Sequence, residues 1–330
     1  MGEGPLLKAG RGWVPLLATL LLLAACNSSE TANSTPQPLT PSTLGKAQAL
    51  LLTQAFPYDD ARKDSVAGPY VQQSRLEVPT DLSPQNKWVM FEGPVLENDV
   101  VAYRFYMDDR HRFDIYGKRV ADLVMDTVGW DYHDVMDWGS DVLKVGNSLG
   151  MGSPAVVFED SVYTFSNAKR KVVEVTEAGG ERAAVRTTFE DLDIGGETVT
   201  IQEDFSLAAG TPAAHIRLRV TEGVLPKGAQ LATGVVIHDT EAAQQMTDDK
   251  VAVYSWGDQS YHGDKLGMAV VADKSTGAVY LAHPLTHLMV FSEGLTEVDY
   301  DMVSGWELGV QPVRTEGEFE AVLEDVMLGR

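Results

Sequence analysis

Apolar and polar residues alternate along much of the chain, which is the pattern of strands that bury one face. The alternating runs are rich in β-branched and aromatic residues, and glycine pairs such as Gly179-Gly180 and Gly195-Gly196 separate several of them. Because few helices intervene, we expect one large, mainly β domain, an antiparallel β-sandwich with a few peripheral helices. The predicted strands cover residues 100–107, 170–177, 183–190, 197–207, 213–222, 230–239, 267–273, 277–283 and 286–293.

Three segments depart from the alternation and predict helices. Residues 44–56 suggest one short helix, and residues 118–128 suggest a helical interruption between strands. Near the C-terminus, Thr315 and Glu318 have the spacing of a capping box. An amphipathic helix laid on a sheet is predicted after it, with its apolar face formed by Phe319, Val322, Leu323, Val326 and Met327.

The N-terminus has the features of a secretory signal peptide over residues 1–25. Lys8 and Arg11 precede an apolar stretch over residues 13–25, which is shorter than the roughly 20 residues that span a bilayer. Small residues then lead to Cys26 and resemble the lipobox of bacterial lipoproteins, in which the cysteine is lipidated. Asn27 favours the outer membrane by resemblance to Gram-negative sorting rules. We therefore expect an outer-membrane lipoprotein, facing the periplasm or the cell surface and held in the membrane by its lipid.

The composition then divides the rest of the chain. Residues 26–45 are rich in Ser, Thr, Pro and Asn, which predicts a disordered tether. Residues 46–330 are predicted to form a single domain. Cys26 is the only cysteine in the sequence, so the chain has no intramolecular disulfide and no cysteine nucleophile.

The formal net charge of −22 argues against a nucleic-acid partner, which would require basic patches. An anionic substrate would likewise need a local basic patch. Such a cluster occurs around one predicted strand, and from it we select Arg104, Arg110 and Lys118 as substrate-binding residues. Alternation places Arg104 and Tyr106 on one face of this strand, where Tyr106 would stack on a sugar and Arg104 would hydrogen-bond to it. The alternative is that these cations form structural ion pairs with Glu97, Asp108, Asp109 and Asp114.

Residues 130–153 combine polar aromatics, a titratable ring and four glycines, which suits a loop that carries function better than a buried strand. His133 can act as acid or base, Trp138 offers a flat surface for a sugar, and Lys144 offers a positive charge. The alternative is a packed loop with structural side chains. Further candidates are His238 as a second acid or base, and Trp256 and Tyr261 as binding residues. No metal-binding spacing and no dinucleotide or phosphate-loop motif is present, so we predict neither a metal nor another cofactor.

Residues 91–156 resemble a family of secreted bacterial proteins catalogued as a domain of unknown function. The resemblance continues more weakly to about residue 300. It implies a galactose-mutarotase-like β-supersandwich and a role in breaking down uronate-rich polysaccharides such as pectin, alginate and ulvan. This chain has Leu96 where members often carry an aromatic residue. The shared residues are Glu97, Asp99, Tyr103, Arg104, Asp114, Gly117, Lys118, Tyr132, His133, Trp138, Gly139, Asp141, Lys144, Gly146 and Ser148.

Fold alone does not select the activity, and three hypotheses follow. The first is β-elimination on a uronate oligosaccharide by a carbon–oxygen lyase, either a polysaccharide lyase or an oligosaccharide dehydratase. A cation would neutralise the carboxylate, His133 or His238 would be the base, and Tyr132 or Tyr116 would be the acid. The second is mutarotase-like chemistry or glycoside hydrolysis, and the third is a surface glycan-binding protein without catalysis.

Overall fold

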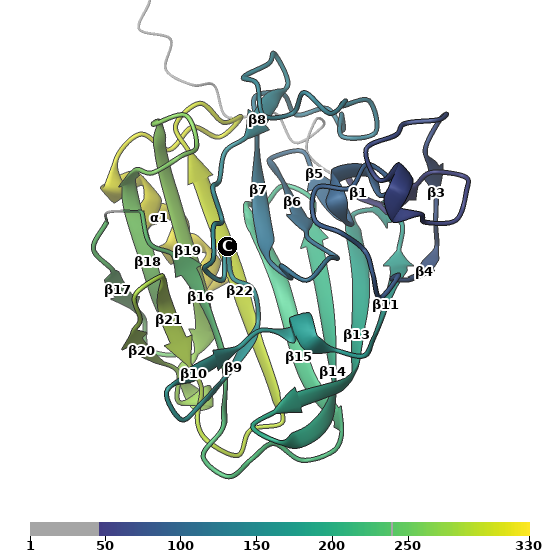
Figure 1. Ribbon diagram of the computed structural model, residues 1–330. Helices are drawn as coiled ribbons and strands as arrows, with labels where there is room; N and C mark the ends of the chain where they lie inside the picture. The colour runs from purple at the N-terminus through teal and green to yellow at the C-terminus, as the bar shows by residue number, and fades with distance from the viewer. Residues whose placement is uncertain (1–45, 239) are drawn as a thin grey trace, which may run out of the picture. The chain divides into compact units, whose positions relative to one another are not determined.

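The computed structural model describes residues 46–330 apart from residue 239. The predicted signal peptide, Cys26 and tether lie outside these described residues. Strands dominate the described chain, and every ladder between named strands is antiparallel, which confirms the predicted mainly β fold class (Figure 1). No described helix is both long and apolar enough to cross a bilayer.

The largest sheet has nine strands and contains most of the strands predicted from alternation. Its order is β17 (Ala243–Met246), β18 (Lys250–Asp258), β19 (Lys265–Asp273), β22 (Glu297–Trp306), β15 (Ala213–Glu222), β14 (Glu197–Ala208), β13 (Arg182–Ile194), β11 (Arg170–Glu177) and β4 (Arg75–Glu77).

A six-stranded sheet packs across part of this large sheet. Its order is β12 (Gly179–Gly180), β1 (Ala47–Leu50), β5 (Val95–Asn98), β6 (Val101–Phe105), β7 (Phe113–Lys118) and β8 (Gly139–Asp141). A five-stranded sheet has the order β10 (Ser161–Tyr163), β9 (Ala155–Phe158), β16 (Gln230–Val236), β21 (Thr286–Val290) and β20 (Val279–Ala282). The last pair is β2 (Leu52–Thr53) and β3 (Val71–Gln72).

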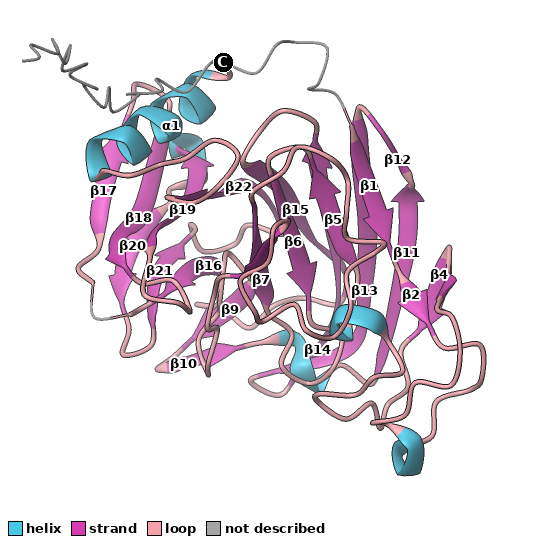
Figure 2. Cartoon of the chain, turned by 90° about the horizontal axis from the view of Figure 1, so that it is seen from above, coloured by secondary structure: helices cyan, strands magenta, loops and turns pink. Residues whose placement is uncertain are grey.

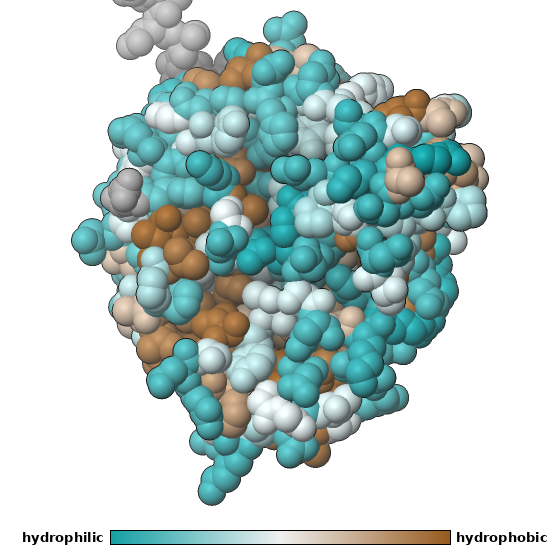
Figure 3. Space-filling view, viewed as in Figure 1, coloured by the Kyte–Doolittle hydropathy of each residue, from teal (hydrophilic) through white to brown (hydrophobic). Residues whose placement is uncertain are grey.

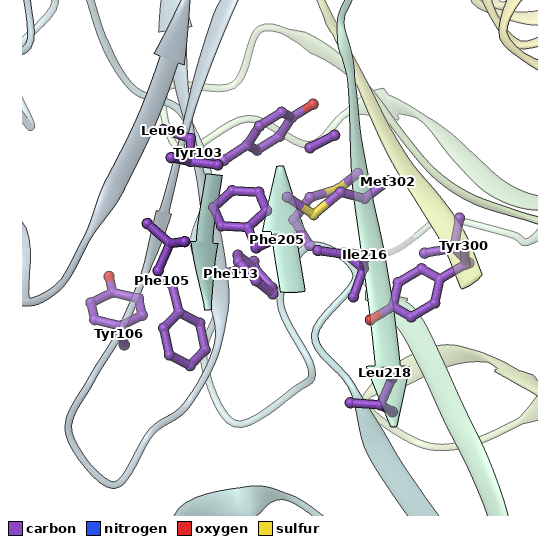
Figure 4. Close-up of a cluster of buried hydrophobic side chains, with 14 of the residues drawn as sticks. Leu96, Tyr103, Phe105, Tyr106, Phe113, Phe205, Ile216, Leu218, Tyr300 and Met302 are labelled. Carbon is purple, nitrogen blue, oxygen red and sulfur yellow. The ribbon is translucent and has the colours of Figure 1, made fainter. Parts of the chain in front are cut away.

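The main core lies between the six-stranded and nine-stranded sheets (Figure 4). Phe105 and Phe113 extend from one sheet toward Phe205 and Met302 of the other, and the rings of Phe113 and Phe205 lie 4.7 Å apart. Because side chains alternate across a strand, the opposite face of β6 carries Ala102 and Arg104 away from this core, as the alternation predicted.

The C-terminal helix α1 (Glu316–Leu328) packs on the other face of the large sheet, beside β18 and β19 (Figure 2). Its predicted capping box is present, because the Thr315 side chain accepts from the Glu318 backbone and the Glu318 side chain accepts in return. The Phe319 ring lies over Gly267 and Gly305, where added Cβ atoms would come within 2.6 and 3.0 Å of it. Trp256 stacks on the same ring at 5.8 Å.

Two helix predictions are wrong. Residues 44–56 contain β1 and β2, because β1 pairs with β5. Its side chains alternate: Ala47 and Ala49 enter the core, and Gln48 between them donates a hydrogen bond to Glu97. Lys118 ends β7, and residues 119–128 form bends and turns, because the Glu97 carboxylate accepts the backbone N–H groups of Val124 and Met125 and holds this segment out of a helix.

Lys118 and Glu97 form a fully buried ion pair that joins β7 to β5, with 2.7 Å between Nζ and Oε1. The Lys118 ammonium also donates to the backbone carbonyls of Asn98 and Asp122. We expect Lys118→Met to lower the free energy of unfolding by roughly 3–5 kcal/mol, because it leaves a buried carboxylate without its cation.

Urea denaturation measures this loss. Lys265→Met is the matched control, because Lys265 pairs with Asp258 at the surface, where an ion pair is worth about 0–1 kcal/mol. Equal losses for the two variants would contradict a structural role for the buried pair.

Candidate functional site

A cavity of about 570 Å³ lies where the loops before β5, between β6 and β7, on both sides of β8 and after β18 come together. Hydrophilic side chains cover most of the face shown in Figure 3, in keeping with the acidic composition. The cavity is lined by Gln85, Lys87, Glu92, Tyr106, Arg110, Trp130, Tyr132, His133, Asp141, Leu143, Lys144, Val145, Gly146, Asn147 and Tyr261.

The guanidinium of Arg104 lies behind this lining and holds several of its residues in place. Arg104 is 1% exposed and projects from β6. Its Nη2 lies 2.7 Å from Asp114 on β7 and 2.7 Å from Asp141 on β8. A buried charge is costly unless it is paired and hydrogen-bonded, so these ion pairs fix both acids relative to β6.

The two acids bound to Arg104 lie close enough to influence each other. Burial and the neighbouring Asp141 raise the pKa of Asp114 to about 6. The Tyr106 hydroxyl donates a hydrogen bond to Asp114 over 2.8 Å and accepts one from Arg104. One guanidinium thus compensates two buried carboxylates, one of which takes up a proton in mildly acidic solution.

Tyr132 joins this network to the cavity. Its hydroxyl accepts from Arg104 Nη1 over 3.1 Å and donates to Glu92 over 3.3 Å. Burial raises the pKa of Tyr132 to about 12, against the opposing effect of Arg104. The phenol therefore carries its proton at neutral pH and has a cation beside it that would stabilise the phenolate.

His133 lies at the edge of the cavity and faces Asp141. Its Nδ1 is 3.3 Å from Asp141 Oδ2, and this hydrogen bond raises the pKa of His133, whereas partial burial lowers it. The side chain is 54% exposed, and no described residue is hydrogen-bonded to its Nε2. A histidine whose Nδ1 is held by a carboxylate presents Nε2 as a proton acceptor, which is the arrangement of many general bases.

The backbone that supplies one wall of the cavity has an uncommon conformation. Gln85, Phe91 and Glu92 have φ angles of 59°, 61° and 62°, in the left-handed region that side chains disfavour. Glu92 accepts the backbone N–H of Gln85 over 2.9 Å and forms an ion pair with Arg110. Such conformations persist only where the surrounding contacts impose them, and they cluster at functional sites.

The positively charged side chains that line the cavity differ in whether acidic side chains of the protein already bind them. Arg110 is bound to both Glu92 and Asp108. Lys87 and Lys144 also line the cavity, and no carboxylate of the described residues lies within 4 Å of either ammonium. These two lysines are therefore the positive charges that an anionic ligand could engage without displacing an acidic side chain.

The arrangement allows acid–base chemistry and the binding of an anionic, partly apolar ligand. His133 can accept a proton, Tyr132 can donate one, and aromatic rings and two lysines surround them. Within the described part of the chain, no group of three or more His, Cys, Asp or Glu residues is placed to hold a metal ion.

Comparison with known proteins assigns the chain to a family. Residues 27–327 match the family described as a domain of unknown function (DUF4861). The chain belongs to this family. The match covers all of the described strands and most of α1, so the candidate site lies inside the family domain.

Three similarities to individual proteins accompany this assignment. The uncharacterised protein P7 of Formosa agariphila is 27% identical over 143 residues, which cover 43% of this chain and 34% of that protein, so the match spans about a third of the relative's length. A candidate aldose 1-epimerase of Klebsiella pneumoniae has a TM-score of 0.35 at 9% identity, with 86% and 95% of the two chains covered. A candidate kojibiose phosphorylase from the human microbiome has a TM-score of 0.37 at 7% identity, with 70% and 32% covered.

The structure brings six of the predicted site residues of this DUF4861 protein together around the cavity. Tyr132 and His133 come from the catalytic predictions. The others come from the predicted binding residues, and they are Tyr106, Arg110, Lys144 and Tyr261. Arg104 and Tyr116 are buried behind the lining, where Tyr116 packs edge-on against Tyr132 at 5.6 Å. Arg104 therefore holds other site residues in place, in contrast to the predicted direct contact with a sugar.

Besides Arg104 and Tyr116, four predicted residues do not line the cavity. Lys118 is the buried partner of Glu97, so the alternative of a structural ion pair describes it. Trp138 packs near Tyr116 at 6.2 Å, and Trp256 stacks on the helix residue Phe319. His238 follows β16 and lies outside the cavity lining.

The prediction missed the wall formed by residues 85–92. Gln85, Lys87 and Glu92 are distant from His133 in sequence and reach it only through the fold. Glu92 precedes Gly93-Pro94, and this turn signal before a strand was the one local indication of a functional loop. Trp130 lies in the segment selected for its chemistry, but Trp138 was preferred over it.

We expect the pKa of His133, measured by titration of its ring resonances in NMR spectra, to lie above the ordinary value of 6.5. Asp141→Asn removes the negative charge that favours the imidazolium, so the pKa of His133 should fall. His215 provides an internal control, because Asp301 and Asp299 raise its pKa independently. A His133 pKa that Asp141→Asn leaves unchanged, with His215 also unchanged, would show that the pair is not formed.

Proposed function

We propose that this protein binds a uronate-containing oligosaccharide in the cavity and catalyses β-elimination, with His133 as the base. The observation that carries the proposal is the pairing of His133 with Asp141 at the edge of a cavity that also presents aromatic rings and two lysines, neither of which is paired with an acidic residue of the described chain. The aromatic rings suit the apolar faces of sugars. The lysines suit a carboxylate.

The proposed reaction begins with the proton on C5 of the uronate, next to its carboxylate. Lys144 binds the carboxylate and lowers the charge that builds up on it as this proton leaves. His133 Nε2 takes the proton, and the electrons of the C5–H bond form the C4=C5 double bond. The C4–O bond breaks, and its electron pair departs with the oxygen.

Tyr132 is the proposed acid that protonates the departing oxygen. Its raised pKa keeps the phenol protonated until that step, and Arg104, 3.1 Å away, stabilises the phenolate that results. Departure of a sugar hydroxyl makes the reaction that of a lyase, and departure of water makes it that of a dehydratase. Tyr116 is set aside as the acid because it packs behind Tyr132 and, unlike Tyr132, does not line the cavity.

A glycan-binding role without catalysis is the second candidate. The exposure of His133, more than half of its side chain, favours it, because water competes with a substrate for an exposed base. Ring opening of a sugar, as in a mutarotase, would also use a histidine and a carboxylate.

Ultraviolet absorbance tests these alternatives, because the C4=C5 double bond conjugated to the carboxylate absorbs where the saturated substrate does not. We expect absorbance to rise when residues 46–330 meet one of the oligosaccharides from pectin, alginate or ulvan. His133→Gln should lower kcat by about 10²–10⁴-fold, the usual contribution of a general base. The rate should increase with pH through a midpoint above 6.5, because a raised pKa keeps His133 protonated, and inactive, up to a higher pH.

His283→Gln is the matched control, because His283 lies outside the cavity lining. Full turnover by His133→Gln would exclude the proposed base. If no oligosaccharide gives a rise in absorbance but one of them binds, glycan binding without catalysis would be favoured. Interconversion of anomers without a rise in absorbance would favour ring opening.

We also propose that the chain is a lipoprotein of the outer membrane, on the basis of the sequence that precedes Cys26. In a Gram-negative host, Cys26→Ser should move the protein from the membrane fraction to the soluble fraction, because the residue that accepts the lipid is lost. Asn27→Asp keeps the cysteine and should redirect the protein to the inner membrane. Fractionation with no change in either variant would contradict the proposal.

A further inference from the structure

Trp130 and Lys87 form part of the cavity that the proposed mechanism does not use. Both side chains are half-buried, and the Lys87 ammonium lies 6.0 Å from the centre of the Trp130 ring. The ammonium lies over the indole and has no acidic partner among the described residues, so the pair presents an apolar surface and a positive charge together. A sugar acid has the matching features, because its ring has apolar C–H faces and its edge carries a carboxylate.

Hydrogen bonds fix the Trp130 ring relative to the backbone that carries Lys87. The Trp130 indole donates to the Tyr70 hydroxyl over 2.9 Å, and this hydroxyl donates to the backbone carbonyl of Lys87 over 2.6 Å. The fully buried Asn86 accepts the backbone N–H groups of Trp88 and Val89 and thereby holds the loop that carries Lys87. A site fixed before the ligand arrives loses less conformational entropy on binding.

The aromatic rings of the cavity follow one another from this site to the proposed base. The Trp130 ring lies 6.0 Å from that of Tyr132, which lies 4.5 Å from His133, and His133 lies 6.0 Å from Tyr261. Among the described residues, Trp130 and His133 each contact Tyr132 but make no ring contact with each other. A sugar that stacks on Trp130 would therefore be separated from His133 by the Tyr132 ring.

We infer that Trp130 and Lys87 form a second saccharide subsite, in which the indole stacks on a neighbouring uronate and Lys87 binds its carboxylate. The inference rests on the proposed function and specifies its substrate as an oligosaccharide with at least two acidic residues. Lys144 serves the reacting uronate and Lys87 serves its neighbour. Lys87 and Trp130 then determine specificity and take no part in the proton transfers.

Calorimetric titration tests the subsite with saturated uronate trisaccharides from pectin, alginate and ulvan. We expect Lys87→Met to weaken binding of the preferred trisaccharide about tenfold or more, the usual effect of losing a hydrogen bond to a charged group. Trp130→Ala should weaken it by a similar factor, and Trp130→Phe, which keeps a ring, should weaken it less. In turnover, Lys87→Met should raise KM and leave kcat unchanged, because the contact is the same in ground and transition states.

Lys227→Met is the control, because it removes the same charge from an exposed position outside the cavity. The Lys87 side chain forms no hydrogen bond or ion pair with a described residue and contacts the Trp130 ring only at 6.0 Å, so its substitution should leave the thermal midpoint close to that of the unsubstituted protein and separate binding from folding. Equal affinities for Lys87→Met and Lys227→Met would overturn the subsite while leaving the proposed reaction intact. Failure of all three trisaccharides to bind the unsubstituted protein would overturn both.

Discussion

The candidate site depends on one buried guanidinium, that of Arg104, which pairs with two buried carboxylates. Arg104 is bound to acids from the two strands that follow it in the sheet, and through Asp141 and Tyr132 it positions both groups proposed to move protons. Removing only the cation would leave two buried carboxylates without the arginine that pairs with both, which usually costs more than the pair itself contributes. The residues bound to Arg104 therefore depend on one another, and together they hold the floor of the cavity in one arrangement.

The fold was largely predictable because strand alternation is a local property. In β19, Met268 and Val270 belong to the core between the sheets, whereas Ala269 and Val271 pack with the helix α1, so the period of two is visible in the sequence. The helix predictions over residues 44–56 and 118–128 failed because pairing with β5 and capture by the Glu97 carboxylate act over long distances along the chain. Neither contact can be inferred from the amino-acid composition of the segment.

The candidate site was predictable only in part, for the same reason. The segment with His133, Tyr132 and Lys144 was identified by its unusual mixture of residue types. Lys118 was assigned to substrate binding because a sequence does not show whether a lysine is exposed or paired inside a sheet. Lys87 and Glu92 were missed because only the folded chain brings their loop to His133. The sequence also does not show that the arginines are bound by acidic side chains, whereas the two lysines of the cavity can still bind a ligand.

The contact of α1 with the large sheet has a consequence for motions of the cavity. Phe319 rests on the bare backbone of Gly267 and Gly305 and on the ring of Trp256, which lies near the end of β18. The loop that carries Tyr261 begins directly after that strand, so the helix supports the base of one cavity wall from the opposite face of the sheet. Local opening of α1 would therefore remove this support from the wall that carries Tyr261, although the helix itself lies on the other face of the sheet.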